Sequence, residues 1–308
     1  MLALVRDGRR NPPIALQQVA EPQPGSGEAL VEVRASSVNR GELALLGSRD
    51  DGWRPGQDVA GVVIEPAGDG GGPSAGSRVV ALVEGAAWSQ RVAVPLERLA
   101  TIDEKVTLEQ AATLGIVGLT ALRSLRAVGP LLGRSVLVRG ARGGLGHFVV
   151  QLAAVAGAEV TAQARTDAGT DQLRDLGAAH VATGEETPGM RFDVVVDVVG
   201  GASLEQSIEA VAAGGTILLL GAVNPEPARI TLLDFIGHEG ARILTFFSYT
   251  GDAARIGADL ATLAALVSEG RLRPIIDRST AWTDIDQLLE AMAKGQVAGK
   301  AVLTVAQS

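Results

Sequence analysis

The chain has 308 residues and contains no cysteine, so it forms no disulfide bond, and the redox compartment cannot be read from its cysteines. Lysine occurs only three times, and no block of basic residues is present. The net charge of −8 argues against binding to nucleic acid or to an anionic membrane surface. No apolar run is long enough to span a bilayer, and the apolar start Met1–Val5 ends at Arg6, too early for a signal sequence. We therefore expect a cytoplasmic protein.

Apolar residues make up 46% of the chain, which is enough for a sizeable core in about two domains. Up to Thr113 the sequence shows short strand-like runs between turns: Leu30–Ala35, Val59–Ile64, Arg78–Val83 and Gln90–Val94. From Leu114 to Phe247 apolar strands alternate with helices, which predicts a parallel sheet covered on both faces. We expect the closing elements, Ala253–Ser268, Ile285–Ala293 and Ala301–Val305, to return to the first domain. The predicted domains are therefore 1–113 with 248–308, and 114–247.

The stretch Ser135–Arg165 reads as strand, glycine turn, helix and strand. Strands are expected at Val136–Val138 and Glu159–Ala164, with a helix over Phe148–Ala156 between them. This is the layout of a dinucleotide-binding βαβ unit, although Ala141 stands where the strict pattern has its first glycine. A glycine turn with a purely structural role in some other α/β domain is the competing interpretation. The predicted contacts to a pyrophosphate are Gly140, Arg142, Gly143, Gly144, Leu145 and Gly146. The alternative for Arg142 is an exposed turn residue.

The residues after the second strand indicate which dinucleotide binds. An NAD site places an acidic residue about 20 residues past the glycines, where it binds the ribose 2′-hydroxyl. This chain has Arg165 and Thr166 there, and a guanidinium attracts a 2′-phosphate. The sequence therefore favours NADPH; alternatively, Arg165 is a solvated loop residue and Asp167 contacts the ribose.

Ligands of open α/β sheets bind outside the carboxyl ends of the strands. Gly200 and Gly201 follow the predicted strand Phe192–Val199, and Gly221 and Ala222 lie at the end of the predicted strand Thr216–Gly221. We expect Gly200 and Gly201 to line the adenosine side, and Gly221 and Ala222 to pass beside the nicotinamide carboxamide, with Val223 as a further cofactor contact.

Eight motifs follow one another along the chain: SSVNRGEL (Ser36–Leu43), PGQDVAGVV (Pro55–Val63), GSRVVAL (Gly76–Leu82), AATLGIVGLTAL (Ala111–Leu122), the Gly140–Gly146 turn, DVVVDVVGG (Asp193–Gly201), LLLGAV (Leu218–Val223) and GKAVLTV (Gly299–Val305). In this order they resemble the medium-chain dehydrogenase/reductase superfamily, on its zinc-independent quinone oxidoreductase (ζ-crystallin-like) branch. The resemblance implies an α/β fold with a GroES-like β-rich catalytic domain and a Rossmann domain with a doubly wound parallel sheet. It also implies an active site between the domains and hydride transfer with a nicotinamide.

Zinc-dependent members of that superfamily hold Zn²⁺ with cysteine and histidine. Here the position of the usual catalytic cysteine resembles Ser37, and the Gly-His-Glu motif resembles Gly56-Gln57-Asp58. The structural lobe with four cysteines has no counterpart in Ser77–Ser89. We therefore expect neither catalytic nor structural zinc, and without that Lewis acid an alcohol dehydrogenase activity is not expected.

The resemblance places several side chains near the reaction. Asn39 is the first candidate for a polar contact to the substrate or the nicotinamide ribose; the alternative is an asparagine that braces a turn. Thr120 is expected to approach the nicotinamide, and the alternative is helix packing. Lys300 resembles a residue that lines the cleft, but a solvated surface lysine is equally compatible with the sequence. Tyr249 is a candidate general acid. The alternatives are that the tyrosine has a packing role and that water donates the proton.

Other residues have two interpretations. His147 is either a phosphate contact or a residue at the helix start that packs or is solvated, and of Arg40 and Glu42 we expect one or both to face solvent. Trp53 lies in a loop that suits a lid or a cleft wall. For Phe246 and Phe247 a core or dimer interface is favoured over an acceptor pocket, although Phe247 is retained among the cofactor contacts. Relatives pair the strand corresponding to Arg242–Phe247 across a two-fold axis, so we expect a homodimer.

The sequence thus predicts an NADPH-dependent, zinc-independent reductase of quinones or α,β-unsaturated carbonyl compounds. Two alternatives stay open. One is a reductase of enoyl thioesters or of polyketide intermediates from the same superfamily. The other is a catalytically idle nucleotide-binding protein that acts as a redox sensor.

Overall fold

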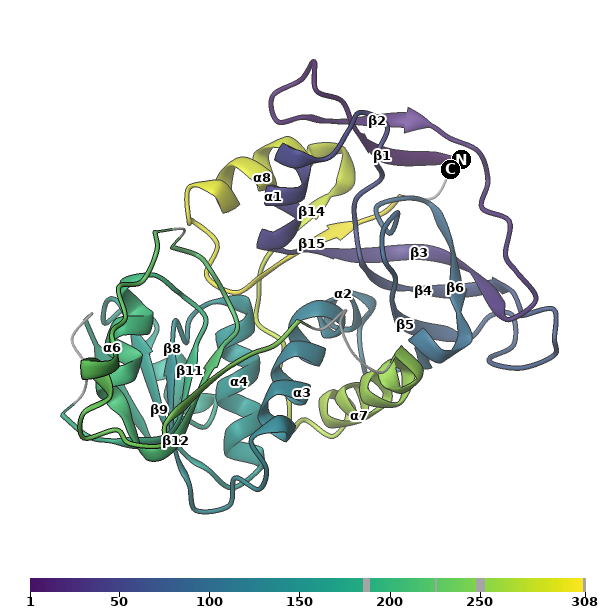
Figure 1. Ribbon diagram of the computed structural model, residues 1–308. Helices are drawn as coiled ribbons and strands as arrows, with labels where there is room; N and C mark the ends of the chain where they lie inside the picture. The colour runs from purple at the N-terminus through teal and green to yellow at the C-terminus, as the bar shows by residue number, and fades with distance from the viewer. Residues whose placement is uncertain (185–188, 225, 248–252, 307–308) are drawn as a thin grey trace. The chain divides into compact units, whose positions relative to one another are not determined.

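The computed structural model describes residues 1–184, 189–224, 226–247 and 253–306. The chain divides into two compact units, each with its own sheets (Figure 1). Unit 1 comprises Met1–Leu119, Gly251–Gly270 and Pro274–Ser308, and unit 2 comprises Thr120–Thr250 and Arg271–Arg273. The elements expected to return to the first domain, at the C-terminal end of the chain, belong to unit 1.

Unit 2 contains a six-stranded sheet in the order β10-β9-β8-β11-β12-β13, in which all neighbouring strands are parallel. Its strands are β8 (Ser135–Arg139), β9 (Glu159–Ala164), β10 (His180–Thr183), β11 (Phe192–Asp197), β12 (Val211–Leu219) and β13 (Arg242–Thr245). The chain proceeds outward from β8 to β10, then returns to lay β11 beside β8 and proceeds outward to β13. The strand order therefore reverses between β8 and β11, where open α/β sheets bind their ligands.

Helices cover both faces of this sheet. The helical segments of this part of the chain are α3 (Leu119–Ala127), α4 (Gly144–Val155), α5 (Thr170–Asp175), α6 (Ala202–Ala210) and the 3₁₀ turn η3 (Leu232–Phe235). Helix α4 packs against β8 and β9, whereas α6 packs against β11 and β12 from the opposite face (Figure 1). Because both faces are covered, the central residues of β8 and β11 are fully buried. The predicted doubly wound parallel sheet is confirmed.

Two element boundaries differ from the predictions at places that matter for function. Helix α4 begins at Gly144 rather than at Phe148, because the glycines that hid its start from the apolar pattern are part of its first turn. Strand β13 ends at Thr245, which pairs with Leu219 at the end of β12. The expected edge strand Arg242–Phe247 was therefore too long, and Phe246 and Phe247 lie beyond its last paired residue.

Unit 1 is built on a seven-stranded sheet in the order β14-β15-β3-β4-β5-β7, with β6 also paired to β3, and on a separate hairpin of β1 and β2. The strands are β1 (Leu2–Arg6), β2 (Ile14–Gln18), β3 (Glu28–Val38), β4 (Asp58–Glu65), β5 (Arg78–Leu82), β6 (Arg91–Pro95), β7 (Leu99–Thr101), β14 (Ile276–Ala281) and β15 (Lys300–Thr304). Strands are thus present at all four positions predicted up to Thr113. The first half of β3 pairs with β6 and its second half with β15, so β3 connects both parts of the sheet.

The helical segments of unit 1 are α1 (Arg40–Ser48), α2 (Leu108–Ala112), a π-helical turn η2 (Leu114–Gly118), α7 (Ile256–Ser268), α8 (Ile285–Ala293) and the 3₁₀ turns η1 (Leu96–Arg98), η4 (Ala253–Arg255) and η5 (Trp282–Asp284). Apolar residues of β3, β4 and β15 form one buried core with Trp88 and with α8. Within the described ranges, no helix has the length and apolar character needed to cross a membrane.

Candidate functional site

The glycine turn of unit 2 has the predicted strand–turn–helix geometry. Gly140 follows β8 with φ +76°, and Gly143 caps the N-terminus of α4 while its N–H donates to the Gly140 carbonyl at 3.0 Å. A Cβ on Gly140 would lie 2.6 Å from Val198 Cγ2, and one on Gly146 would lie 2.7 Å from Ala141 Cα. Both positions therefore require glycine. The first N–H groups of α4 have no partner within the helix, which leaves them available to an anion.

The loops after β11 and β12 meet at the same edge of the sheet. A Cβ on Gly200 would lie 3.1 Å from the Gly221 carbonyl oxygen, and one on Gly221 would lie 2.8 Å from the Val198 carbonyl carbon. The buried Asp197 fixes the first loop, because its Oδ1 accepts the N–H groups of Val199 and Gly200 at 2.8 and 2.9 Å. The structure thus brings the predicted residues Gly140, Gly200 and Gly221 together where the strand order reverses. Ala222 and Val223 follow directly, and Val223 is exposed.

The loop after β9 carries the predicted specificity residues. Arg165, Thr166 and Asp167 are all exposed. The Arg142 guanidinium reaches this loop from the glycine turn, with Nη1 at 3.5 Å from Thr166 Oγ1. The turn and the loop are also joined through the backbone, because Ala141 N–H donates to the Gln163 carbonyl at 3.1 Å.

His147, in the first turns of α4, is 2% exposed. Neither ring nitrogen has a hydrogen-bond partner among the described residues. Burial lowers the pKa of His147 to about 4, with smaller contributions from the charges of Arg142 and Arg273. The imidazole is therefore neutral at pH 7. Solvation, one interpretation of this residue, is excluded by its burial.

In unit 1, a buried polar cluster surrounds Asp58, which is 0% exposed at the start of β4. Its Oδ2 accepts hydrogen bonds from Ser37 Oγ and, at 2.9 Å, from Asn39 Nδ2. Its Oδ1 accepts the Ile116 N–H at 2.7 Å. A Cβ on Gly115 would collide with this carboxyl group, so the π-helical turn can approach Asp58 only because residue 115 is glycine.

Asn39 and Lys300, predicted as site residues on family resemblance, belong to this cluster. Lys300 Nζ donates to Asn39 Oδ1 at 2.6 Å and lies 3.9 Å from Asp58 Oδ2. Lys300 is 3% exposed, so it is not a solvated surface lysine. Burial lowers the pKa of Lys300, while the carboxyl groups of Asp58 and Glu42 act in the opposite direction. Asn39 also precedes α1, and its side-chain amide bonds to Asp58 and to Lys300.

Glu42 is the second buried carboxyl group of the cluster and is 1% exposed, whereas Arg40 faces solvent. Its Oε2 accepts the Asn39 N–H at 2.7 Å and its Oε1 accepts the Gln57 N–H at 3.1 Å. Burial, followed by the charge of Asp58, raises the pKa of Glu42 to about 8. The sequence carried a usable signal for this contact, since Asn39 and Glu42 have the spacing of a capping box.

The remaining predicted residues are placed as follows. Thr120 is buried in α3 of unit 2, and Phe247, after β13, is 53% exposed. Tyr249 lies outside the described residues. Trp53 packs against the core of unit 1, with the Arg49 guanidinium 6.0 Å from its ring centroid. Sequence reasoning did not identify Asp58 and Glu42 as members of the site.

The described residues at the positions compared with a zinc site do not form one. Ser37 Oγ donates a hydrogen bond to Asp58, and Gln57 and Asp58 stand at the positions compared with the histidine and glutamate of zinc-dependent relatives. Among the described residues, no group of three or more His, Cys, Asp or Glu side chains could hold a metal ion.

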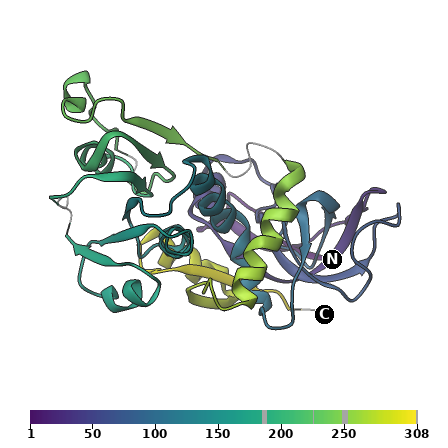
Figure 2. The same cartoon turned by 90° about the horizontal axis from the view of Figure 1, so that it is seen from below.

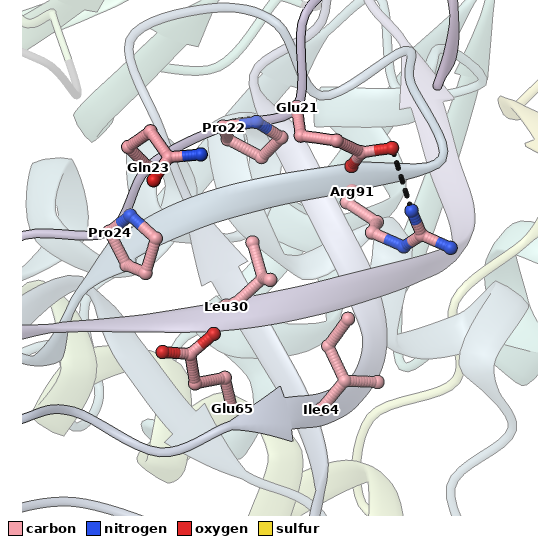
Figure 3. Close-up of a pocket in the computed structure, with 8 residues that line it drawn as sticks. All are labelled: Glu21, Pro22, Gln23, Pro24, Leu30, Ile64, Glu65 and Arg91. Atoms are coloured by element: carbon pink, nitrogen blue, oxygen red, sulfur yellow. Dashed lines mark hydrogen bonds and ion pairs between the residues drawn. The ribbon is translucent and has the colours of Figure 1, made fainter.

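A hollow of about 510 Å³ lies elsewhere on unit 1, between the segment Glu21–Pro24 and strands β3, β4 and β6 (Figure 3). Glu21 closes one side through an ion pair with Arg91 at 2.9 Å. The hollow shares no residue with the glycine turn or with the Asp58 cluster, so it is not a candidate for the predicted chemistry.

Comparisons with known proteins identify similar sequences and structures. The profile of a family described as "Zinc-binding dehydrogenase" matches residues 168–303. A highly reducing polyketide synthase of Arthrinium phaeospermum is 32% identical over 89% of the chain, which spans only 12% of that synthase. The acryloyl-coenzyme A reductase of Metallosphaera sedula is 25% identical over 94% of the chain and 96% of its own length. Among solved structures, the quinone oxidoreductase of Coxiella burnetii superposes with a TM-score of 0.84 at 26% identity, covering 99% of both chains.

Proposed function

The chain belongs to the medium-chain dehydrogenase/reductase superfamily, a family of oxidoreductases, and on that premise we propose that it is an NADPH-dependent, zinc-independent reductase of quinones or α,β-unsaturated carbonyl compounds. Unit 1 has the GroES-like fold and unit 2 the Rossmann fold of these proteins. The observation that carries the proposal is the glycine turn at the point where the strand order of unit 2 reverses.

The residues of unit 2 suit a dinucleotide. The open N–H groups at Gly144, Leu145 and Gly146 would hold the pyrophosphate, with the positive end of the α4 dipole behind them. Gly200, Gly221, Ala222, Val223 and Phe247 would flank the adenosine and nicotinamide ends. Arg165 and Thr166 would hold the 2′-phosphate that distinguishes NADPH from NADH. When bound, the reduced nicotinamide supplies a hydride.

A quinone or an activated alkene suits a site without a Lewis acid, because conjugation already makes one carbon electrophilic. The protein must orient that carbon and stabilise the oxyanion that forms as the hydride adds. We assign Lys300 and Asn39 to this polar side of the site. The cationic Lys300 would attract either the oxyanion or a cofactor phosphate, and Asn39 holds its ammonium group in place. Thr120 is assigned to the nicotinamide side, and Tyr249 or water to the proton that completes the reduction.

The second candidate function is reduction of an enoyl thioester. Two relatives favour it: a reductase named for acryloyl-coenzyme A, and a polyketide synthase. Both candidates share the same hydride transfer to a conjugated carbon and differ only in what the carbonyl carries.

We also propose a homodimer. Strand β13 is at the edge of the sheet, and the segment before it exposes large apolar side chains: Leu232 at 86%, Leu233 at 71% and Ile236 at 71%. Figure 2 shows this light green segment projecting from the rest of unit 2. A second copy of the chain paired at β13 would cover these side chains.

The first experiment is a titration of the purified protein with NADPH and with NADH, followed by tryptophan fluorescence. Tight binding of NADPH and weak binding of NADH support the proposal. A panel of quinones, enones and enoyl thioesters then separates the two candidate reactions. Nucleotide binding without turnover of any acceptor would leave an idle binding protein, and no binding of either nucleotide would overturn the oxidoreductase assignment.

A further inference from the structure

The side chain of Arg142 crosses from the glycine turn to the loop after β9. Its Nη1 lies 3.5 Å from Thr166 Oγ1, and its Nε would lie 3.1 Å from a Cβ built on Gly169. Gly169 has φ +77°. The guanidinium therefore lies along the segment 166–169, with a hydrogen bond to Thr166 at its start and a close approach to Gly169 at its end. The glycine motif alone does not predict that Arg142, the third residue of the turn, contacts the loop after β9.

This guanidinium is available to an anion. Among the described residues, no carboxylate pairs with Arg142, and its one hydrogen bond goes to the neutral Thr166 hydroxyl. Arg165, one residue before Thr166, is exposed and makes no hydrogen bond or ion pair in the same part of the chain. The loop carries one acidic side chain, the exposed Asp167, which forms no ion pair with either arginine. Two unneutralised guanidinium groups and a hydroxyl group thus belong to one short loop and the turn beside it.

We propose that Arg142 is a specificity-determining residue that binds the ribose 2′-phosphate of NADPH together with Arg165 and Thr166. The inference rests on the proposed function, and it moves Arg142 from the pyrophosphate to the 2′-phosphate. A phosphate monoester carries close to two negative charges and presents three acceptor oxygens, so it can engage two guanidinium groups and a hydroxyl group at once. A 2′-hydroxyl offers no charge to either arginine.

A matched pair of ligands isolates this contact. Adenosine 2′,5′-bisphosphate and adenosine 5′-monophosphate differ only in the 2′-phosphate, and their binding is measured by titration calorimetry without any turnover. The wild type is expected to prefer the bisphosphate. In Arg142→Gln the affinity for the bisphosphate is expected to fall about 10-fold to 100-fold, the usual effect of losing a hydrogen bond to a charged group. The affinity for the monophosphate should stay within about twofold.

Arg174→Gln is the control for a general loss of positive charge. Arg174 is an exposed arginine on the neighbouring helix α5, where it pairs with Asp171. Its substitution should change neither affinity by more than about twofold, since exposed pairs contribute little. Arg142→Lys keeps the charge but loses the planar fork, and it should recover only part of the affinity.

The outcomes are distinguishable. Equal loss of both ligands in Arg142→Gln would mean that the residue binds the common 5′-phosphate side, and would overturn the inference. So would an unchanged bisphosphate affinity in Arg142→Gln, or a wild type that binds both ligands equally. If the wild type binds neither of these ligands nor NADPH, the proposed function itself fails.

Discussion

Lys300 Nζ donates a hydrogen bond of 2.6 Å to Asn39 Oδ1, although the two residues are 261 positions apart in the chain. Strand β15 starts at Lys300 and pairs with the end of β3, immediately before Asn39, so the sheet itself sets this contact. Asp58 Oδ2 accepts a hydrogen bond from Nδ2 of the same Asn39 amide. The asparagine thus links a buried ammonium group to a buried carboxyl group, and neither charge is left without a partner.

Asp58→Asn is expected to destabilise the protein by about 3 kcal/mol or more, because it leaves Lys300 buried without its counter-charge. The new amide would also place its NH₂ group against groups that donate hydrogen bonds to Asp58, such as the Asn39 amide and the Ile116 N–H. Urea unfolding measures the loss. The double variant Asp58→Asn/Lys300→Met should recover part of it, because the uncompensated charge is removed.

Asp286→Asn is the control, because Asp286 forms an exposed pair with Arg10. Its effect should stay below about 1 kcal/mol. Equal losses in both aspartate variants, or no recovery in the double variant, would contradict the assigned role of Asp58.

Glu42 makes stability depend on pH. Its pKa is raised from 4.5 to about 8, so between these values the folded protein holds a proton that the unfolded chain has released. Stability should therefore fall as the pH rises from about 4.5 to 8 and level off above 8. Glu42→Gln should flatten this slope. It should also lower stability by the same amount at every pH, because the glutamine amide group accepts a hydrogen bond from one backbone N–H fewer. Unfolding curves at intervals of one pH unit test this, and a slope unchanged by the substitution would count against it.

Local patterns were sufficient to predict much of the fold. The strand β9 and the helix α8 have the predicted bounds, because each shows a regular apolar pattern between turn residues. Helix α1 was not predicted: its apolar pattern is weak, and its start depends on the contact between Glu42 and the Asn39 backbone. The sequence showed the residues of this capping box without showing that the carboxyl group is buried.

The site was predictable where it depends on local sequence and not where it depends on distant pairing. The glycine turn follows directly from residues within one βαβ unit. The Asp58 cluster instead joins β3, β4, η2 and β15, which no periodic pattern connects. Asp58 could be compared only with a zinc-site motif, and that comparison gave no indication of its hydrogen bonds to Ser37 and Asn39.

His147 should make the protein sensitive to acid. Its pKa is lowered from 6.5 to about 4, so in this interval the unfolded chain takes up a proton that the folded protein does not. Stability should therefore fall as the pH decreases from 6.5 to 4, by at most about 1.4 kcal/mol per pH unit. His147→Leu should remove this component and keep or raise stability at pH 7, because two unpartnered ring nitrogens leave the interior.

His180→Gln is the matched histidine control, since His180 is exposed beside Glu159. It should leave the fall in stability between pH 6.5 and pH 4 unchanged. If His180→Gln abolished this fall in stability and His147→Leu did not, the acid sensitivity would have another origin than His147.

The close packing at Gly146 predicts a sharp difference between two glycines of the same turn. Gly146→Ala places a Cβ against the backbone of residues 140 and 141, which cannot move without shifting β8 from α4, so we expect a loss of about 1–3 kcal/mol. Gly143→Ala meets no atom closer than 3.4 Å and has an ordinary φ of −74°, so its loss should be about 1 kcal/mol or less. Thermal unfolding compares the two, and equal losses would argue against this packing.

The proposed dimer predicts where a charge should break the assembly. Leu233→Asp places a carboxylate in the exposed apolar segment before β13, and burying that charge against a second copy would be strongly unfavourable. The wild type should have about twice the mass of the 31.5 kDa chain in light scattering, and the variant should have the mass of one chain. Leu132→Asp is the control, because Leu132 is 83% exposed in the same unit but outside this segment. The control should remain a dimer, since an exposed leucine outside a dimer interface tolerates a charge. A monomeric wild type would contradict the proposed dimer. Dissociation by Leu132→Asp alone would place the interface elsewhere.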